Sequence, residues 1–187
     1  MNDADIRKPF LKFISSKNNE KEYRIIPEMG ICDGFARADI AVVSDVLCGY
    51  EIKSDVDTLE RLPSQVEYYS RTFDYASVVV GEKFKGVIAQ HVPAWWGIYC
   101  VHQDAEGTVV IEELRQAEQN KHVDAMALLE LLWRKELYAL LKECGIKGIS
   151  GKNRRFLRRL ASEAIPASTI KEYVIRTIRE RKEWRNE

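Results

Sequence analysis

The chain has 187 residues, 45% of them hydrophobic, and no formal net charge at pH 7, which is typical of a soluble globular protein that needs no disulfide bonds to hold its core. Its four cysteines form no C-x-x-C pair and its three histidines form no metal-binding motif, which argues against a structural zinc site and for a reducing compartment. No apolar run reaches the roughly 20 residues of a membrane-spanning helix, and the first residues do not form a signal peptide, so we predict a cytoplasmic protein with no membrane contact.

The first predicted element is a helix over residues 5–15, in which apolar side chains recur at helical spacing: Ile6, Phe10, Leu11 and Ile14. A first strand is expected over residues 23–28. Residues 35–43 and 46–53 alternate in polarity, and the turn residues Ser44 and Asp45 lie between them. This pattern predicts a β-hairpin.

Within this hairpin, side-chain alternation sorts the residues onto two faces. In the first strand, one face is expected to carry Arg37, Asp39 and Ala41, and the other the apolar set Ala36, Ala38, Ile40 and Val42. In the second strand, Glu51 and Lys53 are two residues apart and share a face. The hairpin can therefore bring Asp39 beside Glu51 and Lys53.

A helix over residues 58–73 is predicted next, and because Pro63 is tolerated only in a first turn, this helix is expected to begin near Leu62. Residues 75–80 form a near-continuous β-branched run, typical of a strand buried on both faces. A helix over residues 82–91 follows. Two further strands are then expected, at residues 96–101 and 109–114.

The rest of the chain predicts helices: one long amphipathic helix over residues 123–144 and two basic helices over residues 153–164 and 168–184. The order of elements predicts an α/β fold with a mixed central sheet flanked by helices, and a C-terminal helical extension. We divide it into a core at residues 1–114 and a basic extension at residues 115–187. From Gly145 onward, the chain has 12 Lys or Arg and only 5 Asp or Glu.

The combination of Asp39, Glu51 and Lys53 points to metal-dependent hydrolysis. Two neighbouring carboxylates repel each other unless a cation neutralises them, and Mg²⁺ or Mn²⁺ prefers oxygen ligands. Such an ion acidifies a bound water and polarises a phosphate, while a lysine balances the developing charge. The alternative is a solvated strand face with a surface ion pair; the same E-x-K spacing recurs at Glu180 and Lys182, where no site is expected.

The stretch from Arg37-Ala38-Asp39 to Glu51-Ile52-Lys53-Ser54 resembles the D-(x)n-E-x-K core of the PD-(D/E)XK nuclease superfamily, whose fold is restriction-endonuclease-like. Gln65 and Tyr69 are similar to the Q-x-x-x-Y element of its RecB-like branch. Together with Pro93-Ala94-Trp95-Trp96, the set resembles a small bacterial family of PD-(D/E)XK proteins, and in the R-A-D … E-I-K-S stretch the MmcB-type DNA-repair proteins. The resemblance covers roughly residues 5–100.

This resemblance implies roles for individual residues. Asp39 and Glu51 would be metal ligands and Lys53 the catalytic lysine. Gln65 and Tyr69, one helical turn apart, would touch the phosphate backbone or steady the site, with packing or solvent exposure as the alternative and Tyr68 as a rival. One more upstream acid is implied, for which we choose Glu28, with three rivals: Asp3, Asp5 and Glu20.

Basic residues give candidate nucleic-acid contacts. Arg37 shares the predicted face of Asp39 and can contact phosphate or neutralise the acids. In the extension, a cluster surrounds Phe156, Leu157 and Leu160, and either binds phosphates or forms the solvated face of an amphipathic helix: Lys152, Arg154, Arg155, Arg158 and Arg159.

The sequence therefore predicts a Mg²⁺- or Mn²⁺-dependent nuclease, with DNA as the expected substrate, in repair or in defence against foreign DNA. The alternative is a non-catalytic nucleic-acid-binding module on the same fold, which would have no use for the acid–acid–lysine set. A homodimer, or a partner protein from a repair or defence system, is a further expectation about partners.

Overall fold

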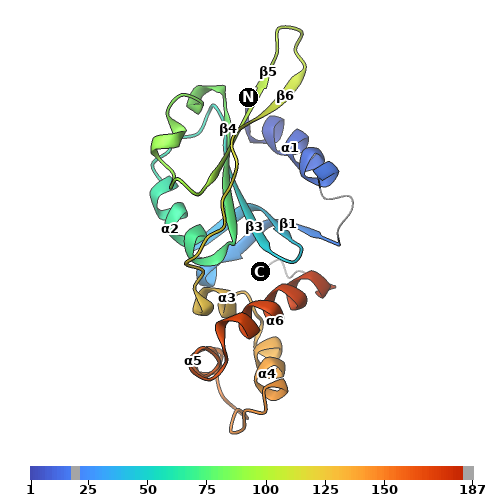
Figure 1. Ribbon diagram of the computed structural model, residues 1–187, viewed down its shortest axis with the longest axis vertical. Helices are drawn as coiled ribbons and strands as arrows, with labels where there is room; N and C mark the ends of the chain where they lie inside the picture. The colour runs from blue at the N-terminus through green and yellow to red at the C-terminus, as the bar shows by residue number, and fades with distance from the viewer. Residues whose placement is uncertain (18–21, 183–187) are drawn as a thin grey trace.

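The computed structural model describes residues 1–17 and 22–182, and they form a six-stranded sheet with helices on both faces and a group of helices at one end (Figure 1). The predicted α/β class, with a mixed sheet flanked by helices and a C-terminal helical extension, is confirmed. The strands are ordered in the sheet as they are in the chain, from β1 to β6. In the described ranges, no helix is both long and apolar enough to cross a membrane.

The first half of the sheet is antiparallel. Helix α1 (Asp3–Lys17) precedes β1 (Arg24–Ile31), β2 (Ala36–Val43) and β3 (Leu47–Lys53). A short 3₁₀ turn, η1 (Cys32–Gly34), joins β1 to β2. The predicted first helix, first strand and hairpin are all confirmed.

The second half begins with a parallel crossover. Helix α2 (Leu62–Thr72) connects β3 to β4 (Tyr75–Gly81), which pairs in parallel with both β3 and β5 (Gly97–Gln103). Strand β6 (Val109–Arg115) then returns antiparallel to β5. As predicted, α2 begins at Leu62, with Pro63 in its first turn.

The predicted helix over residues 82–91 is wrong. The segment forms two 3₁₀ turns instead, η2 (Glu82–Phe84) and η3 (Ile88–Gln90). Gly86 lies between them, a residue of low helix propensity. Both turns still bury an apolar side chain, Phe84 and Ile88, which accounts for the periodicity that suggested a helix.

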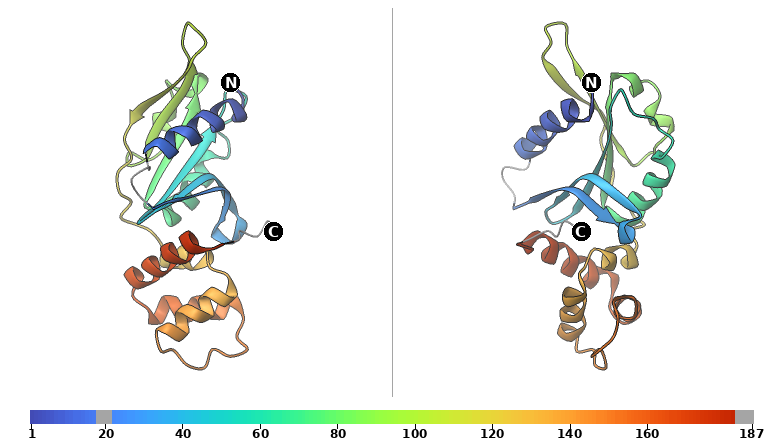
Figure 2. Two further views of the ribbon diagram at one scale, coloured as in Figure 1. Left: turned by 90° about the vertical axis from the view of Figure 1, so that its right-hand side faces the viewer. Right: turned by 180° about the vertical axis from the view of Figure 1, so that it is seen from behind.

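Helices α1 and α2 cover opposite faces of the sheet (Figures 1 and 2). On the α1 side, Ile6 and Phe10 pack with sheet residues such as Tyr99 in a small apolar cluster. On the α2 side a larger cluster contains Tyr69 and Phe73 of that helix. The sheet therefore separates two cores, and the face of each strand residue can be assigned from the core it joins.

This assignment corrects the predicted faces of β2. Ala38 packs in the α2-side core and Ile40 in the α1-side core, so they do not share a face. The alternation is interrupted at Asp39: the β1–β2 ladder pairs Pro27 with Ile40 and Met29 with Ala38, but skips the position between. On β1 that position is Glu28, whose φ of 52° is unusual for a residue with a side chain. The irregularity turns Asp39 out of the regular ladder.

The long helix predicted over residues 123–144 is also wrong, because it is two helices, α3 (Ala125–Glu130) and α4 (Arg134–Glu143). Trp133 adopts an extended conformation between them. Its N–H donates to Glu136 Oε2 over 2.7 Å, and a carboxylate that accepts from the residue three positions earlier is typical of a new helix start. Helix α4 ends at Glu143, and Gly145, two residues later, has the positive φ of 72° that is common just after a helix.

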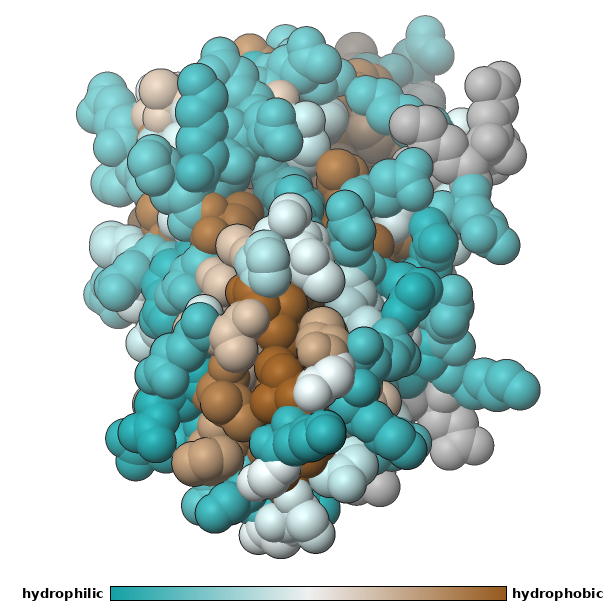
Figure 3. Space-filling view, turned by 60° about the horizontal axis from the view of Figure 1, so that its bottom comes forward, coloured by the Kyte–Doolittle hydropathy of each residue, from teal (hydrophilic) through white to brown (hydrophobic). Residues whose placement is uncertain are grey.

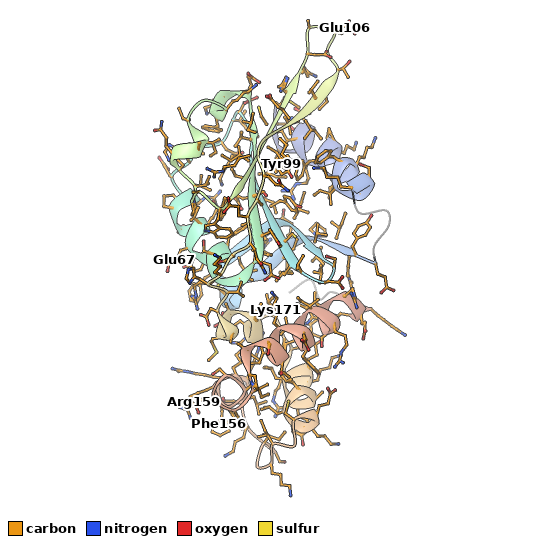
Figure 4. All side chains as sticks on the ribbon, viewed as in Figure 1. Glu67, Tyr99, Glu106, Phe156, Arg159 and Lys171 are labelled. Carbon is orange, nitrogen blue, oxygen red and sulfur yellow. The ribbon has the colours of Figure 1, made fainter. Side chains whose placement is uncertain are left out.

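Helices α5 (Arg154–Ala164) and α6 (Ala167–Glu180) confirm the two basic helices, although the last predicted residue, Trp184, lies outside the described part. Lys171 of α6 points to the sheet and pairs with the buried Asp74, while Phe156 and Arg159 lie on α5 at the far end (Figure 4). Seen from that end, apolar side chains gather in a strip between hydrophilic rims (Figure 3).

The helical extension shares the larger core with the sheet. That cluster runs from Met29 and Phe73 through Leu128 and Leu140 to Val174. The boundary predicted at residue 114 stays a prediction, but no separate core isolates the described helices of the extension from the sheet.

Candidate active site

A polar groove of about 470 Å³ opens beside the carboxyl end of β3, on the α2 side of the sheet. Residues of β2, β3 and α2 meet in it, with contributions from α1 and from the segment after β3. Six of the predicted site residues line it: Glu28, Arg37, Asp39, Glu51, Lys53 and Gln65.

Glu51 and Lys53 form a buried ion pair in this groove. Their exposed fractions are 2% and 4%, and Lys53 Nζ donates to Glu51 Oε1 over 2.8 Å. Gln65 of α2 bridges the pair, since its Nε2 donates to Glu51 Oε1 and its Oε1 accepts from Lys53 Nζ over 2.8 Å. Tyr69 donates from its hydroxyl to Glu51 Oε2 over 2.7 Å. The structure therefore brings four predicted residues together, with Tyr69 rather than Tyr68 on the carboxylate.

The electrostatics of Glu51 follow from this position. Burial, and then the nearby charge of Asp39, raises the pKa of the Glu51 carboxyl to about 6, although the Lys53 ammonium acts in the opposite direction. Burial, followed by the Glu51 charge, also keeps the pKa of Tyr69 well above its ordinary value. The Tyr69 hydroxyl is therefore a hydrogen-bond donor to Glu51 at any pH near neutrality.

Asp39 lies where the pairing between β2 and β3 ends. The β2–β3 ladder ends at the pair Ile40–Tyr50, and the next amide without a ladder partner on that side belongs to Ile52. Asp39 Oδ2 accepts from this N–H over 2.7 Å, and Oδ1 accepts from Arg7 over 3.0 Å. The Asp39 side chain thus caps the neighbouring strand, and it lines the same groove as Glu51.

Arg7 belongs to the site, and sequence reasoning missed it. Its guanidinium contacts Asp3 over 2.8 Å and Glu28 and Asp39 over 3.0 Å each. Asp3 above all, and then Asp39, raise the pKa of Arg7 further, although burial acts in the opposite direction. The available signal was the four-residue spacing from Asp3 to Arg7, which places both on one helical face, but the predicted helix began only at residue 5.

Two residues lie where the additional upstream acid of the site is expected. Glu28 and Asp3 both line the groove and both reach Arg7. Asp5 is exposed and pairs locally with the amide of Asn2, and Glu20 is outside the described residues. Within residues 1–17 and 22–182, no three of these carboxylates bring their oxygens within 4.8 Å of one another.

A hard divalent cation fits the donor set of Asp39 and Glu51. Mg²⁺ usually takes one or two protein carboxylates and completes its shell with water and substrate oxygens. An ionised carboxylate has about four lone-pair positions. Three side-chain donors occupy positions on the Glu51 carboxylate, and two donors occupy positions on the Asp39 carboxylate. By this count each carboxylate keeps at least one lone pair available to an ion.

The basic residues divide into two groups. Arg37 is exposed at the groove, 3.9 Å from Glu28. In the extension, three of the five candidates are exposed around Phe156, whose ring contacts two of them: Lys152, Arg155 and Arg159.

The other two candidates have internal roles, which corrects their assignment as nucleic-acid contacts. Arg158 is buried and forms a two-pronged ion pair with Asp33 of η1, both distances being 2.6 Å. Arg154 donates to the carbonyl oxygens of Glu130 and Leu132. Both arginines join α5 to neighbouring segments, which the basic sequence pattern alone did not reveal.

Comparison with known proteins gives one clear relationship. Residues 1–187 match the family described as Bacteriophage P4 protein cII. Protein cII of Enterobacteria phage P4 is 26% identical over 181 residues, which cover 97% of this chain and 68% of that protein. SfsA of Pyrococcus furiosus, solved in complex with Ca²⁺, matches with a TM-score of 0.39 and 17% identity over 60% of this chain. The chain spans less than two thirds of SfsA, namely 63%, and a similarity this low does not establish a shared fold.

Proposed function

The chain belongs to the bacteriophage P4 protein cII family over its whole length, and we propose that it is a metal-dependent nuclease of the PD-(D/E)XK type that hydrolyses phosphodiester bonds, with DNA as the expected substrate. The observation that carries the proposal is the buried Glu51–Lys53 pair in an open groove, with Asp39 beside it.

The burial of this pair distinguishes between the two interpretations of the E-x-K spacing, a catalytic site and a solvated strand face. A solvated strand face would leave both side chains in water, yet Glu51 and Lys53 are nearly inaccessible. A buried ion pair gains little net stability over apolar residues of the same size, because both charges lose their hydration. Acids with shifted pKa values that line a groove are instead typical of functional sites, which favours a chemical role for the pair.

Each residue would have a distinct task. Asp39 and Glu51 would hold Mg²⁺ or Mn²⁺, which when bound supplies an acidified water and polarises the phosphate. Lys53 presents an ammonium group to the charge that develops on the phosphate oxygens. Gln65 and Tyr69 are positioning residues, because they fix the Glu51 carboxylate and do not need to touch substrate.

The rim of the groove suits a polyanion that carries bases. Arg37 is exposed there, and Arg61 also lines the groove. Phe35, next to these residues, is 79% exposed, and an exposed aromatic ring offers a stacking surface to a nucleobase. Sequence analysis missed Phe35, because nothing in its pattern distinguished it from a residue at the start of a strand.

The proposal is tested by incubating labelled duplex DNA, single-stranded DNA, branched DNA and RNA with Mg²⁺, Mn²⁺ or EDTA. We expect metal-dependent cleavage by the wild type and a loss of at least about 100-fold in Lys53→Met, the scale of removing one charge-stabilising group. Lys182→Met is the matched control, since Lys182 has the same E-x-K spacing from Glu180 and is exposed just after the end of α6. Cleavage by Lys53→Met at the wild-type rate would refute the proposal.

A second candidate is a non-catalytic nucleic-acid-binding module, favoured by the exposed cluster of Lys152, Arg155 and Arg159 around Phe156. It predicts binding that weakens steeply with salt, persists in EDTA and survives Glu51→Gln. Binding without cleavage in any metal, lost in Arg155→Gln/Arg159→Gln, would support this candidate over the nuclease.

A further inference from the structure

Three side chains with different donor atoms meet at the carboxyl ends of β4 and β5, away from the acids of the groove. Cys100 and His102 are two positions apart on β5 and so project from the same face. Glu82 begins η2 directly after β4, the parallel neighbour of β5. One ligand atom from each residue lies within 4.8 Å of the other two.

The spacing of these atoms is close to that of a tetrahedral ion site. Glu82 Oε2 lies 3.8 Å from Cys100 Sγ and 3.7 Å from His102 Nδ1. With zinc bond lengths of about 2.3 Å to sulfur and about 2.0 Å to nitrogen or oxygen, neighbouring tetrahedral ligand atoms lie about 3.3–3.5 Å apart. These two distances therefore need to shorten by only about 0.3–0.4 Å, and a ring nitrogen of His102 lies within 4.8 Å of Cys100 Sγ.

An independent observation comes from His102. Its Nδ1 is buried, and within the described residues no donor or acceptor makes a hydrogen bond to it. Buried polar atoms are nearly always satisfied in folded proteins, by protein groups, water or ions. This nitrogen faces Glu82 and would be satisfied by an ion held between the three residues.

We propose that Glu82, Cys100 and His102 form a binding site for a borderline-soft divalent ion such as Zn²⁺. Thiolate and imidazole ligands favour such ions, whereas Mg²⁺ and Mn²⁺ prefer oxygen. Binding deprotonates the Cys100 thiol, and the proton goes to solvent. Since the Glu82 side chain is 60% exposed, water can reach a fourth position on the ion.

The ion would fix a turn that touches the groove. Lys83, next to Glu82, donates from its backbone N–H to Asp55 Oδ1 over 3.0 Å, and from Nζ to the carbonyl oxygens of Asp55 and Asp57. Asp57 lines the groove and binds the amide of Ser54, directly after Lys53. An ion on Glu82 would therefore stiffen the segment that follows Lys53, without being part of the acid–acid–lysine set.

Cobalt spectroscopy tests this site directly. Co²⁺ is titrated into the full chain, and thiolate-to-cobalt absorption in the near ultraviolet is recorded. We expect the band in the wild type at one equivalent, and its loss in Cys100→Ser and His102→Ala. Cys144→Ser, which changes the exposed cysteine, is the matched control and keeps the band. No band in the wild type, or the same band in Cys100→Ser, would overturn the proposal.

A second measurement guards against misfolding, because Cys100 is fully buried. Glu82→Ala alters an exposed side chain and should keep the melting temperature of the metal-free protein within a few degrees. Zn²⁺ at 100 times its dissociation constant stabilises the wild type by about 2.7 kcal/mol, so its melting temperature should rise, and the rise should vanish in Glu82→Ala. An equal rise in both proteins would contradict the site. Neither readout depends on nuclease activity.

Discussion

Glu51 accepts three hydrogen bonds in a site where water hardly reaches it, yet its carboxyl remains harder to ionise than in the unfolded chain. A raised acid pKa in the folded state means that folding binds a proton more tightly. This contribution to stability is fully present below the ordinary pKa of 4.5 and is lost as the pH rises through about 6.

We therefore expect the free energy of unfolding in EDTA to fall by about 1.5 kcal/mol between pH 4.5 and pH 6.5 from Glu51 alone, at 1.36 kcal/mol for each pKa unit. Urea denaturation across this range, for wild type and Glu51→Gln, measures it as the difference between the two curves. Glu67→Gln, an exposed glutamate on α2 (Figure 4), is the control. Parallel curves for wild type and Glu51→Gln would show that the assignment of this pKa is wrong.

Tyr69 provides a test of positioning. In Tyr69→Phe the ring still packs against Phe73 and Trp96, but the hydrogen bond to Glu51 is lost, at about 1–2 kcal/mol of stability. On the proposed function, the metal concentration for half-maximal cleavage should rise about 10-fold or more, since partners that orient a ligand carry effects of this size.

Tyr68→Phe is the matched variant, because Tyr68 also lines the groove but does not contact the Glu51 carboxylate. It should leave the metal dependence unchanged. If both variants change it equally, Tyr69 has no special role in holding the carboxylate.

At the scale of single residues, the pairs that share one face of a strand or helix could be predicted. Glu51 and Lys53 share a strand face, which follows from periodicity, and Gln65 and Tyr69, which were singled out by their resemblance to the Q-x-x-x-Y element, share a helix face. Arg7 was missed, because its four-residue spacing from Asp3 indicates only a local ion pair and its helix covers the opposite side of the sheet. Arg158 was misassigned, since a basic residue on an amphipathic helix looks the same whether it meets solvent or a distant aspartate.

Among the elements, the turn η1 has the most demanding backbone. Cys32 and Asp33 both have positive φ, of 50° and 56°, and the Asp33 carboxylate, whose pKa is lowered by its hydrogen bond to Arg158, holds α5 to this turn. The two partners differ in exposure: the Asp33 side chain is 41% exposed and the Arg158 side chain 8%.

This difference predicts an asymmetry. Asp33→Asn leaves a buried guanidinium without its carboxylate and should lower the free energy of unfolding by about 3 kcal/mol. Asparagine tolerates the positive φ, so the backbone is not a confounding factor. Arg158→Met returns Asp33 to water and should cost less, about 1–2 kcal/mol. Urea denaturation at pH 7 compares them, with Arg159→Met on the exposed side as control; equal losses would show that burial does not govern the pair.

Two of the mispredicted features, the helix over residues 123–144 and the faces of β2, have a common cause. The apolar spacing of residues 123–144 continues across Trp133, so periodicity alone describes one helix. Whether a chain breaks there depends on tertiary partners, and Glu136 caps α4 while it also binds Arg181 from the end of α6. The flipped faces of β2 likewise depend on Glu28 in another strand, which no pattern within β2 can show.

For the molecule as a whole, the shared core makes a prediction about the extension. We expect residues 1–122 alone to lack a cooperative unfolding transition, because removal of α3–α6 uncovers the α2-side core around Phe73 and Met29. Calorimetry of the full chain should show a single transition, and the shortened chain should bind hydrophobic dyes. A cooperative transition in residues 1–122 would instead show that the sheet and its flanking helices form an independent domain.

The order of strands in the sheet has a consequence for how the chain acquires its structure. Each strand pairs only with its neighbours in sequence, so no pairing joins strands that are distant along the chain, and the entropy cost of loop closure stays small. During synthesis, a strand that leaves the ribosome finds its partner already present. Helices α3–α6 are made last, and they cover the larger core. We therefore expect the slow step of folding to be the docking of these helices rather than the pairing of strands.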